Sequence, residues 1–112
     1  MHFDWDEHKN HQNLRKHKVR FETAQIVFDD LRAYTRRDSS ADEEERWITV
    51  GSIGSGATLL VIHTYYESGG EEFIRLISAR PAEFHERQAY EEVDKGPKAR
   101  HSRRRGNKRR GY

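Results

Sequence analysis

Arg75 and Arg80 belong to one apolar stretch, residues 73–80, whose isoleucine, leucine and phenylalanine content is typical of a β-strand. A guanidinium stays positively charged and offers paired N–H donors that match phosphate oxygens. An arginine at a strand end beside a helix N-terminus therefore suits stabilisation of a phosphorane-like transition state. Strict alternation puts Arg75 and Arg80 on opposite faces of the strand, unless twist or a bulge brings Arg80 round.

A second interpretation of the same arginines is structural. The sequence also supplies Glu45, Glu83 and Glu86, which are suitable ion-pair partners for Arg75 and Arg80. Charged pairs of this kind are common on protein surfaces without any role in chemistry. Both interpretations remain open at this point.

One face of a predicted N-terminal helix, residues 7–18, combines cationic, amide and imidazole groups. Lys9, Asn13, Lys16 and His17 stand at i, i+4, i+7 and i+8, so helical geometry places them along one side. Such a side could hold a nucleic-acid backbone, and His17 could transfer a proton near neutral pH. The alternative is an ordinary solvated helix face.

Seven histidines raise the question of a metal site, with His8 and His11 one helical turn apart and Asp4 nearby. No third and fourth ligand follows at a recognisable spacing, so we assign no metal ion and no cofactor. The chain has no cysteine, which excludes a thiolate nucleophile and a disulfide and is compatible with a reducing cytoplasm. The glycines of 51–56 lack the lysine of a phosphate-binding loop.

Tyr90 is a further chemical candidate because its phenol lies on a predicted C-terminal helix near the end of the sheet. It could exchange a proton with a substrate or stack on a base. It could equally be a core aromatic residue whose hydroxyl reaches solvent.

The elements that position these residues follow from periodicity. Asp6 suits an N-cap after a short extended entry that contains Phe3 and Trp5, and Pro81 suits the first turn of the last helix. Turn residues separate strand-like clusters. We therefore predict an α+β domain with two N-terminal helices, a four-stranded, mostly antiparallel sheet and a C-terminal helix. The expected segments are helices at 7–18 and about 21–29, strands at about 32–36, 46–50, 58–66 and 72–79, a flexible connection at 51–56, and a helix from 81.

Charge divides the chain near Asp94. Residues 95–112 contain nine Lys or Arg and no acidic residue, whereas residues 1–94 contain 12 basic and 19 acidic residues. We expect a folded domain over 1–94 and a basic tail over 95–112 that is disordered when free and is attracted to polyanions. No apolar run approaches a membrane span, and the N-terminus lacks the features of a secretory signal, so we expect a cytoplasmic protein.

The order of the motifs resembles the BrnT toxin family over residues 3–91. The resemblance rests on several short motifs in the same order as in the family. They are Phe3-x-Trp5-Asp6-x-x-Lys9, Asn13-Leu14-x-Lys16-His17-x-Val19-x-Phe21-x-x-Ala24, Val27-Phe28-Asp29-Asp30, Glu45-Arg46-Trp47-Ile48 with Gly51, Leu60-Val61 with Thr64, Ile74-Arg75-x-Ile77-Ser78-Ala79-Arg80-x-Ala82, and Glu86-Arg87-x-x-Tyr90-Glu91.

This resemblance implies a RelE-like fold and a metal-independent endoribonuclease that inhibits translation. It also implies neutralisation by a BrnA-like antitoxin with a ribbon-helix-helix domain, in a complex that binds its own promoter DNA. In similar toxins the RNA 2′-hydroxyl attacks the adjacent phosphorus while cations stabilise the charge.

The resemblance leads us to divide the candidate residues by role. Catalytic candidates are Arg46, Arg75 and Arg80 for phosphate and transition-state stabilisation, and His17 and Tyr90 for proton transfer. Glu45 and Glu86 are second-rank candidates for the general base, with an ion-pair role as the alternative. Candidates for binding the RNA substrate are Lys9, Lys16, Arg103, Arg104 and Arg105.

Three features depart from the family pattern. Lys18 replaces the usual glycine after the first helix, Pro81 replaces a common lysine, and the basic tail lies beyond the family domain. Two other functions therefore stay open. The chain could be a non-catalytic nucleic-acid-binding module in which the tail does most of the binding, or a degenerate toxin that only binds its antitoxin.

Overall fold

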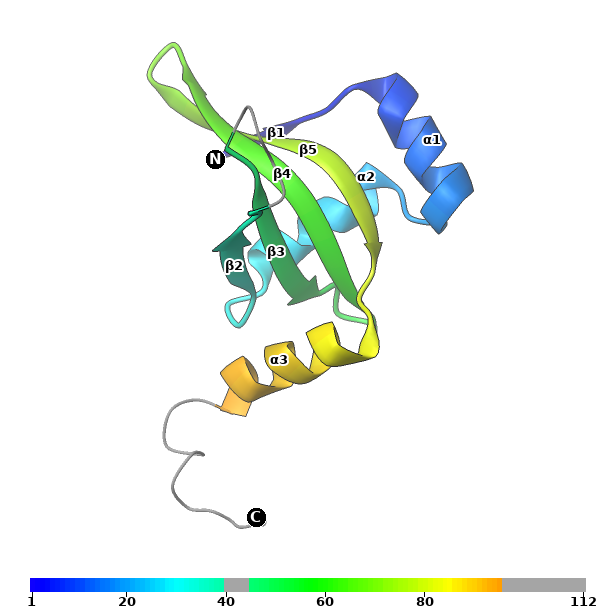
Figure 1. Ribbon diagram of the computed structural model, residues 1–112. Helices are drawn as coiled ribbons and strands as arrows, with labels where there is room; N and C mark the ends of the chain where they lie inside the picture. Colours follow the sequence, from blue (N-terminus) through cyan, green and yellow to red (C-terminus); the bar gives the residue numbers. More distant parts are fainter. Residues whose placement is uncertain (40–44, 96–112) are drawn as a thin grey trace.

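A twisted five-stranded sheet forms the centre of the computed structural model, which describes residues 1–39 and 45–95 (Figure 1). The strand order is β1-β5-β4-β3-β2. The elements are β1 (His2–Asp4), α1 (Glu7–His17), α2 (Phe21–Ala24), the 3-10 helix η1 (Gln25–Asp29), β2 (Tyr34–Arg37), β3 (Trp47–Ser52), β4 (Thr58–Ser68), β5 (Glu71–Pro81) and α3 (Phe84–Lys95).

The α+β class and the antiparallel arrangement of β2 to β5 were predicted correctly, but the number of strands was not. The N-terminal segment, predicted only as an extended entry, pairs with β5 in parallel as strand β1, with His2 opposite Phe73 and Asp4 opposite Arg75. Three residues are too few to show a strand period, and the partner strand lies about 70 residues away in the sequence. The sheet therefore has five strands instead of four.

Helix α1 begins and ends with recognisable caps. The Asp6 carboxylate accepts a hydrogen bond of 2.8 Å from the backbone N–H of His8, as predicted for an N-cap. Lys18 adopts a left-handed conformation with φ 63°, and its N–H donates to the Leu14 carbonyl. A lysine thus occupies a conformation that favours glycine.

The second predicted helix is shorter than expected. Only Phe21–Ala24 is α-helical, and the chain continues as the 3-10 helix η1 up to Asp29. β-Branched and aromatic residues in this segment have low helix propensity, which fits its tighter winding. None of the helices among the described residues is long and apolar enough to span a membrane.

The two faces of the sheet differ in their cover. One face carries the larger core, to which Phe21, Ala24 and Val27 contribute from α2 and η1. The other face carries a smaller cluster around Val50 and Leu60, which α3 covers at one end. We call this second side, which carries Leu60, Ile62 and Thr64 of β4, the open face. In Figure 1, α2 lies behind the sheet and α3 crosses its lower end.

Two predicted boundaries were wrong. Gly51 and Ser52 belong to β3 and not to a flexible connection. A Cβ atom on Gly51 would lie 2.9 Å from Cβ of Ala33 and 3.2 Å from Cβ of Val27, so the glycine allows η1 to approach the sheet closely. Pro81 ends β5 instead of starting α3, which begins three residues later.

Candidate functional site

A bulge in β5 brings Arg75 and Arg80 to the same face of the sheet. Ser78 pairs with Ile62 of β4 but Leu76 pairs with His63, so Ile77 is an extra residue in β5. Arg75 lies opposite Thr64 and Arg80 lies opposite Leu60, two residues that share the open face. The alternation that would separate the two arginines is therefore interrupted between them, and both belong to the open face.

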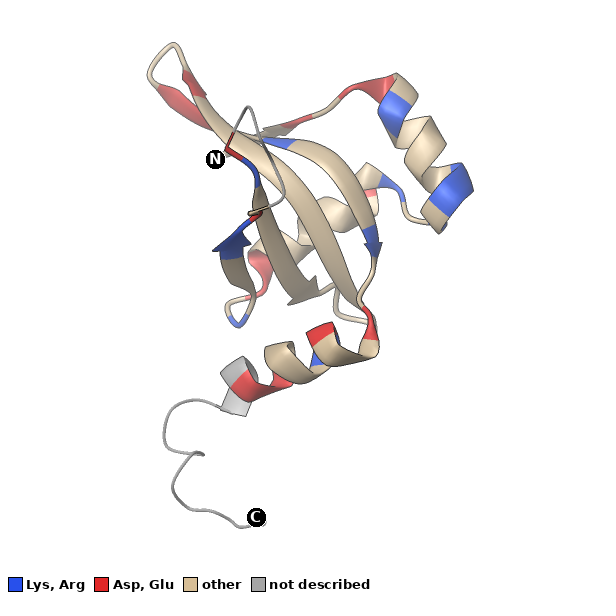
Figure 2. Cartoon of the chain, in the orientation of Figure 1, with Lys and Arg blue, Asp and Glu red and all other residues tan. Residues whose placement is uncertain are grey.

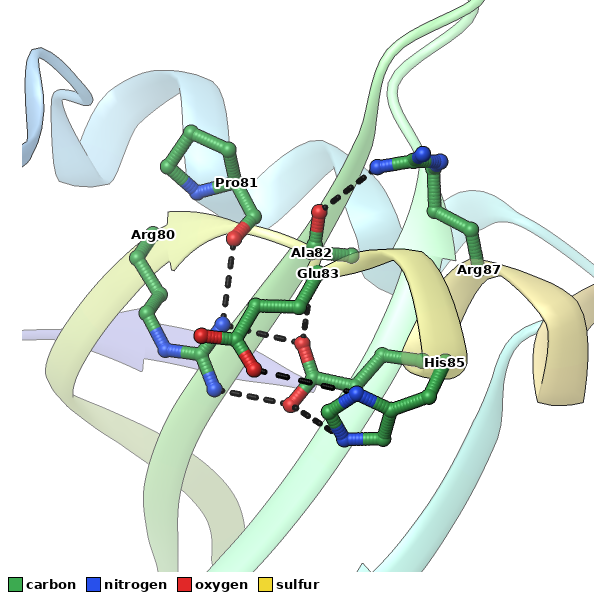
Figure 3. Close-up of polar contacts among 7 residues, drawn as sticks. Arg80, Pro81, Ala82, Glu83, His85 and Arg87 are labelled. Atoms are coloured by element: carbon green, nitrogen blue, oxygen red, sulfur yellow. Dashed lines mark hydrogen bonds and ion pairs between the residues drawn. The ribbon is translucent and has the colours of Figure 1, made fainter.

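The Arg80 side chain joins β5 to the start of α3 through Glu86 (Figure 3). Its Nη1 and Nη2 donate to Oε1 and Oε2 of Glu86 at 2.9 and 2.8 Å, and Nη1 also donates to the Pro81 carbonyl at 3.1 Å. The ion-pair interpretation is thus confirmed for Arg80. The Arg80 hydrogen bonds hold the pKa of the Glu86 carboxyl below its usual value. Glu86 also accepts a bond from the backbone N–H of Glu83.

This pairing leaves one edge of the Arg80 guanidinium available. Glu86 occupies the end of the fork, whereas the Nε–H and the second Nη2 hydrogen have no partner among the described residues. The Arg80 side chain is 31% exposed and that of Glu86 only 7%. An anion can therefore approach the outer edge of a guanidinium that Glu86 already holds in place.

Arg75 has a different partner from those predicted. Its Nη1 lies 3.3 Å from Oδ1 of Asp4 in β1, and Asp4 also accepts a hydrogen bond from the Tyr66 hydroxyl. Asp4 is thus engaged with Arg75 and Tyr66 and not with His8 or His11. Half of the Arg75 side chain remains exposed beside this contact.

Two more arginines belong to the open face. Arg36 of β2 lies opposite Ile48, whose β4 partner is Ile62. Arg46 directly precedes β3, two residues before Ile48, so alternation places it on the same side. Figure 2 shows the basic residues of β2 and β5 apart from the acidic tip of the β4–β5 hairpin. The open face thus carries Arg46, Arg75 and Arg80, the three arginines predicted for phosphate stabilisation, at different positions along its length.

Tyr90 of α3 is bonded to a carboxylate. Its hydroxyl donates to Oδ2 of Asp30 at 2.6 Å, and the same oxygen accepts the backbone N–H of Ser52. Tyr90 also packs against the smaller core, and it lines a pocket of about 280 Å³ together with Asp29 and Asp30. The ring of Tyr90 thus contributes to the core, as one of the two interpretations expected, whereas its hydroxyl is bonded to Asp30.

The predicted face of α1 is only partly exposed. Asn13 is buried and its amide bonds to the backbone of Ala79 in β5, so it serves the fold. Lys9 and Lys16 are exposed, and His17, the last residue of α1, is half-buried. Helix α1 therefore lies along the edge of β5, with its lysines at the surface.

His85 received no functional assignment from the sequence beyond its place among the histidines, yet it lies beside Arg80. Its Nδ1 is 3.7 Å from Glu83 and its Nε2 is 3.9 Å from Glu86. These three residues form a group with metal-ligand atoms within 4.8 Å of one another. Both oxygens of Glu86 already bind Arg80, so we assign no metal here. The signal in the sequence was the pattern Glu-x-His-Glu just after a strand-end arginine.

The remaining candidates are Glu45 and the three arginines of the tail. Glu45 pairs with Arg37 at 3.3 Å. The tail candidates Arg103, Arg104 and Arg105 lie outside the residues that the structure describes.

Comparisons with known proteins agree with this arrangement of the domain. Residues 5–86 match the family described as "Ribonuclease toxin, BrnT, of type II toxin-antitoxin system". The fold is similar to the crystal structure of the Brucella abortus ribonuclease toxin BrnT, with a TM-score of 0.54 and 25% identity, over 74% of this chain and 97% of that one. No curated protein matches this chain in sequence. The chain therefore belongs to the BrnT family of ribonuclease toxins of type II toxin-antitoxin systems.

Proposed function

We propose that this toxin is an endoribonuclease that cleaves RNA without a metal ion, by attack of a 2′-hydroxyl on the adjacent phosphorus. The observation that carries the proposal is the bulge at Ile77, because it gathers Arg75 and Arg80 on the open face. Clustered guanidinium groups supply the positive charge that a metal ion would otherwise provide to a pentacoordinate phosphorus.

The arginines have distinct roles in this proposal. The outer edge of Arg80 binds two oxygens of the scissile phosphate, since Glu86 holds the end of the guanidinium in place. Arg75 and Arg46, on the same face, stabilise the charge that grows in the transition state. The exposed Lys9 and Lys16 of α1 position the flanking backbone.

Proton transfer needs groups that can gain and lose a proton near neutral pH. His17 and Tyr90 are our candidates from the sequence, and each is half-buried. The Tyr90 hydroxyl is engaged with Asp30, which makes it better suited to positioning than to rapid proton exchange. Glu86 and Glu45 are engaged in ion pairs, so neither is a leading general base.

The biological role follows from the family. We infer that cleavage inhibits translation in the cytoplasm and that a BrnA-like ribbon-helix-helix antitoxin neutralises the toxin, the complex binding its own promoter DNA. The domain would comprise residues 1–94 in a RelE-like fold. Co-expression with the neighbouring reading frame tests this role, since a true antitoxin restores growth and co-purifies with the toxin.

The catalytic proposal is tested with Arg75→Ala, Arg80→Ala and a matched control, Arg37→Ala. Arg37 lies opposite Trp47, on the other face of the sheet, which carries the larger core. Cleavage of a labelled RNA in EDTA should fall by about a hundredfold or more for Arg75→Ala and Arg80→Ala, and growth arrest should weaken. The control should cut like the parent. Full activity of both open-face variants would refute the assignment.

A further inference from the structure

His85 occupies a position from which it can reach a phosphate bound to Arg80. His85 is the second residue of α3, and its side chain is 74% exposed. Its Nε2 lies 3.9 Å from Oε2 of Glu86, the oxygen that accepts Nη2 of Arg80 at 2.8 Å. The imidazole and the guanidinium thus contact one carboxylate oxygen, as Figure 3 shows.

We propose that His85 is a catalytic residue of this ribonuclease, the general base that takes the proton of the RNA 2′-hydroxyl. The inference rests on the proposed function, because it requires a phosphate at the outer edge of Arg80. His85 and Arg80 contact the same oxygen of Glu86, so a phosphate at the outer edge of Arg80 would lie beside the imidazole. The substrate would therefore contact both.

The surroundings of the imidazole favour this role. Among the described residues, the charged groups that face it are Arg80 from β5, Glu83 just before α3 and Glu86 from its own helix. Glu83 lies 3.7 Å from Nδ1, too far for a hydrogen bond, but its negative charge stabilises the imidazolium that forms. At 3.9 Å from Glu86, Nε2 makes no hydrogen bond, so its lone pair can accept a proton.

Cleavage forms one bond to phosphorus and breaks another. The 2′-oxygen forms a bond to phosphorus, its proton moves to Nε2 of His85, and the bond from phosphorus to the 5′-oxygen breaks. A water molecule protonates the leaving 5′-oxygen, and the hydroxide that results later removes the proton from the imidazolium. The products are a 2′,3′-cyclic phosphate and a free 5′-hydroxyl. Arg80 stabilises the charge on the phosphate oxygens throughout.

The test compares the full-length parent with His85→Gln and with His8→Gln, which removes an exposed histidine at the start of α1. Single-turnover cleavage of a short RNA is measured in EDTA from about pH 5 to pH 8, the range in which histidine titrates. We expect the rate of the parent to rise with pH, and the rate of His85→Gln to fall by about a hundredfold or more and lose that rise. His8→Gln should behave like the parent.

Chemical rescue separates catalysis from structure. Imidazole added to His85→Ala should restore part of the cleavage, because free imidazole can replace a missing base. It would not restore activity that was lost through a folding defect, and His85 is exposed. If the parent cleaves RNA and His85→Gln keeps its rate and pH profile, the role of His85 is overturned while the proposed function stands. If the parent itself does not cleave RNA, both fail.

Discussion

The side-chain amide of Asn13 binds both backbone groups of Ala79. Its Oδ1 accepts the Ala79 N–H at 3.1 Å, and its Nδ2 donates to the Ala79 carbonyl at 2.8 Å. Strand β1 pairs with β5 only at residues 73–75, so Asn13 takes the place of a neighbouring strand further along the same edge. It thereby attaches α1 to the sheet directly beside Arg80.

Replacing this amide should cost much stability. Asn13→Ala leaves the two Ala79 groups and the carbonyl of Val19, which Nδ2 also contacts at 2.9 Å, without their partner. Each buried unsatisfied group costs about 1–3 kcal/mol, so we expect a loss of about 3 kcal/mol or more in urea unfolding. The control is Gln12→Ala, an exposed position on the same helix. Equal stability of the two variants would show that Asn13 is not needed at this edge.

Gly51 sets the spacing between η1 and β3. In Gly51→Ala the new methyl group would lie 2.9 Å from Cβ of Ala33 and 3.2 Å from Cβ of Val27, so the neighbouring segments would have to shift. Overpacking of this kind costs about 1–3 kcal/mol. Thermal unfolding should show a lower Tm for Gly51→Ala and an unchanged Tm for Ser55→Ala in the exposed connection. An unchanged Tm for both would mean that the two segments separate at little cost.

The sequence alone does not show that Arg75 and Arg80 lie on the same face of the sheet. Alternation in residues 73–80 has two possible phases, because both Phe73 with Ile77 and Ile74 with Leu76 are apolar pairs. Local sequence therefore cannot place the bulge, which only the pairing with β4 reveals. The six-residue spacing of Arg80 and Glu86 across a strand-helix connection was predictable, and their ion pair is confirmed.

Long-range contacts escaped prediction for the same reason. The partner of Arg75 is Asp4, which lies in a three-residue strand at the other end of the domain. Buried polar residues were also misjudged, since the helical spacing of Asn13 with Lys9 and Lys16 indicates a shared face but does not tell which member turns toward the sheet. Periodicity defines the elements, whereas tertiary packing decides the site.

His63 should make stability depend on pH. Its side chain is fully buried in β4, where Nε2 lies 2.7 Å from Oγ1 of Thr49 and the ring packs edge-on against Phe28 and Tyr65. Burial lowers the pKa of His63 from 6.5 to about 4. The unfolded chain therefore binds a proton at a higher pH than the folded protein does.

Because of this difference, the buried His63 makes the free energy of unfolding larger at higher pH. The contribution of the neutral imidazole is fully present above about pH 6.5 and is lost as the pH falls toward about 4, by about 3 kcal/mol in total. Unfolding free energies measured by urea denaturation between these pH values should show the loss in the parent and a flatter curve in His63→Gln, which keeps a polar group near Thr49. Parallel curves for the two proteins would contradict this account.

The basic tail should affect RNA binding more than RNA cleavage. Nine of the 21 Lys and Arg residues of the chain lie within 95–112, outside the domain that holds Arg75, Arg80 and His85. Each phosphate contact that is lost reduces the slope of log affinity against log salt by about 0.7 for single-stranded RNA. A chain that ends at Asp94 should therefore bind RNA more weakly and with less salt dependence.

Cleavage at saturating RNA distinguishes an enzyme from a binder that depends on its tail. If the open face carries the chemistry, the chain ending at Asp94 keeps the single-turnover rate of the parent once enough RNA is present, because residues of the domain then act on the reacting phosphate. A second variant keeps the tail length but replaces its nine Lys and Arg with Gln, and it should behave like the truncated chain. If both variants lose cleavage at every RNA concentration, the tail belongs to the catalytic machinery, and the site on the open face is incomplete without it.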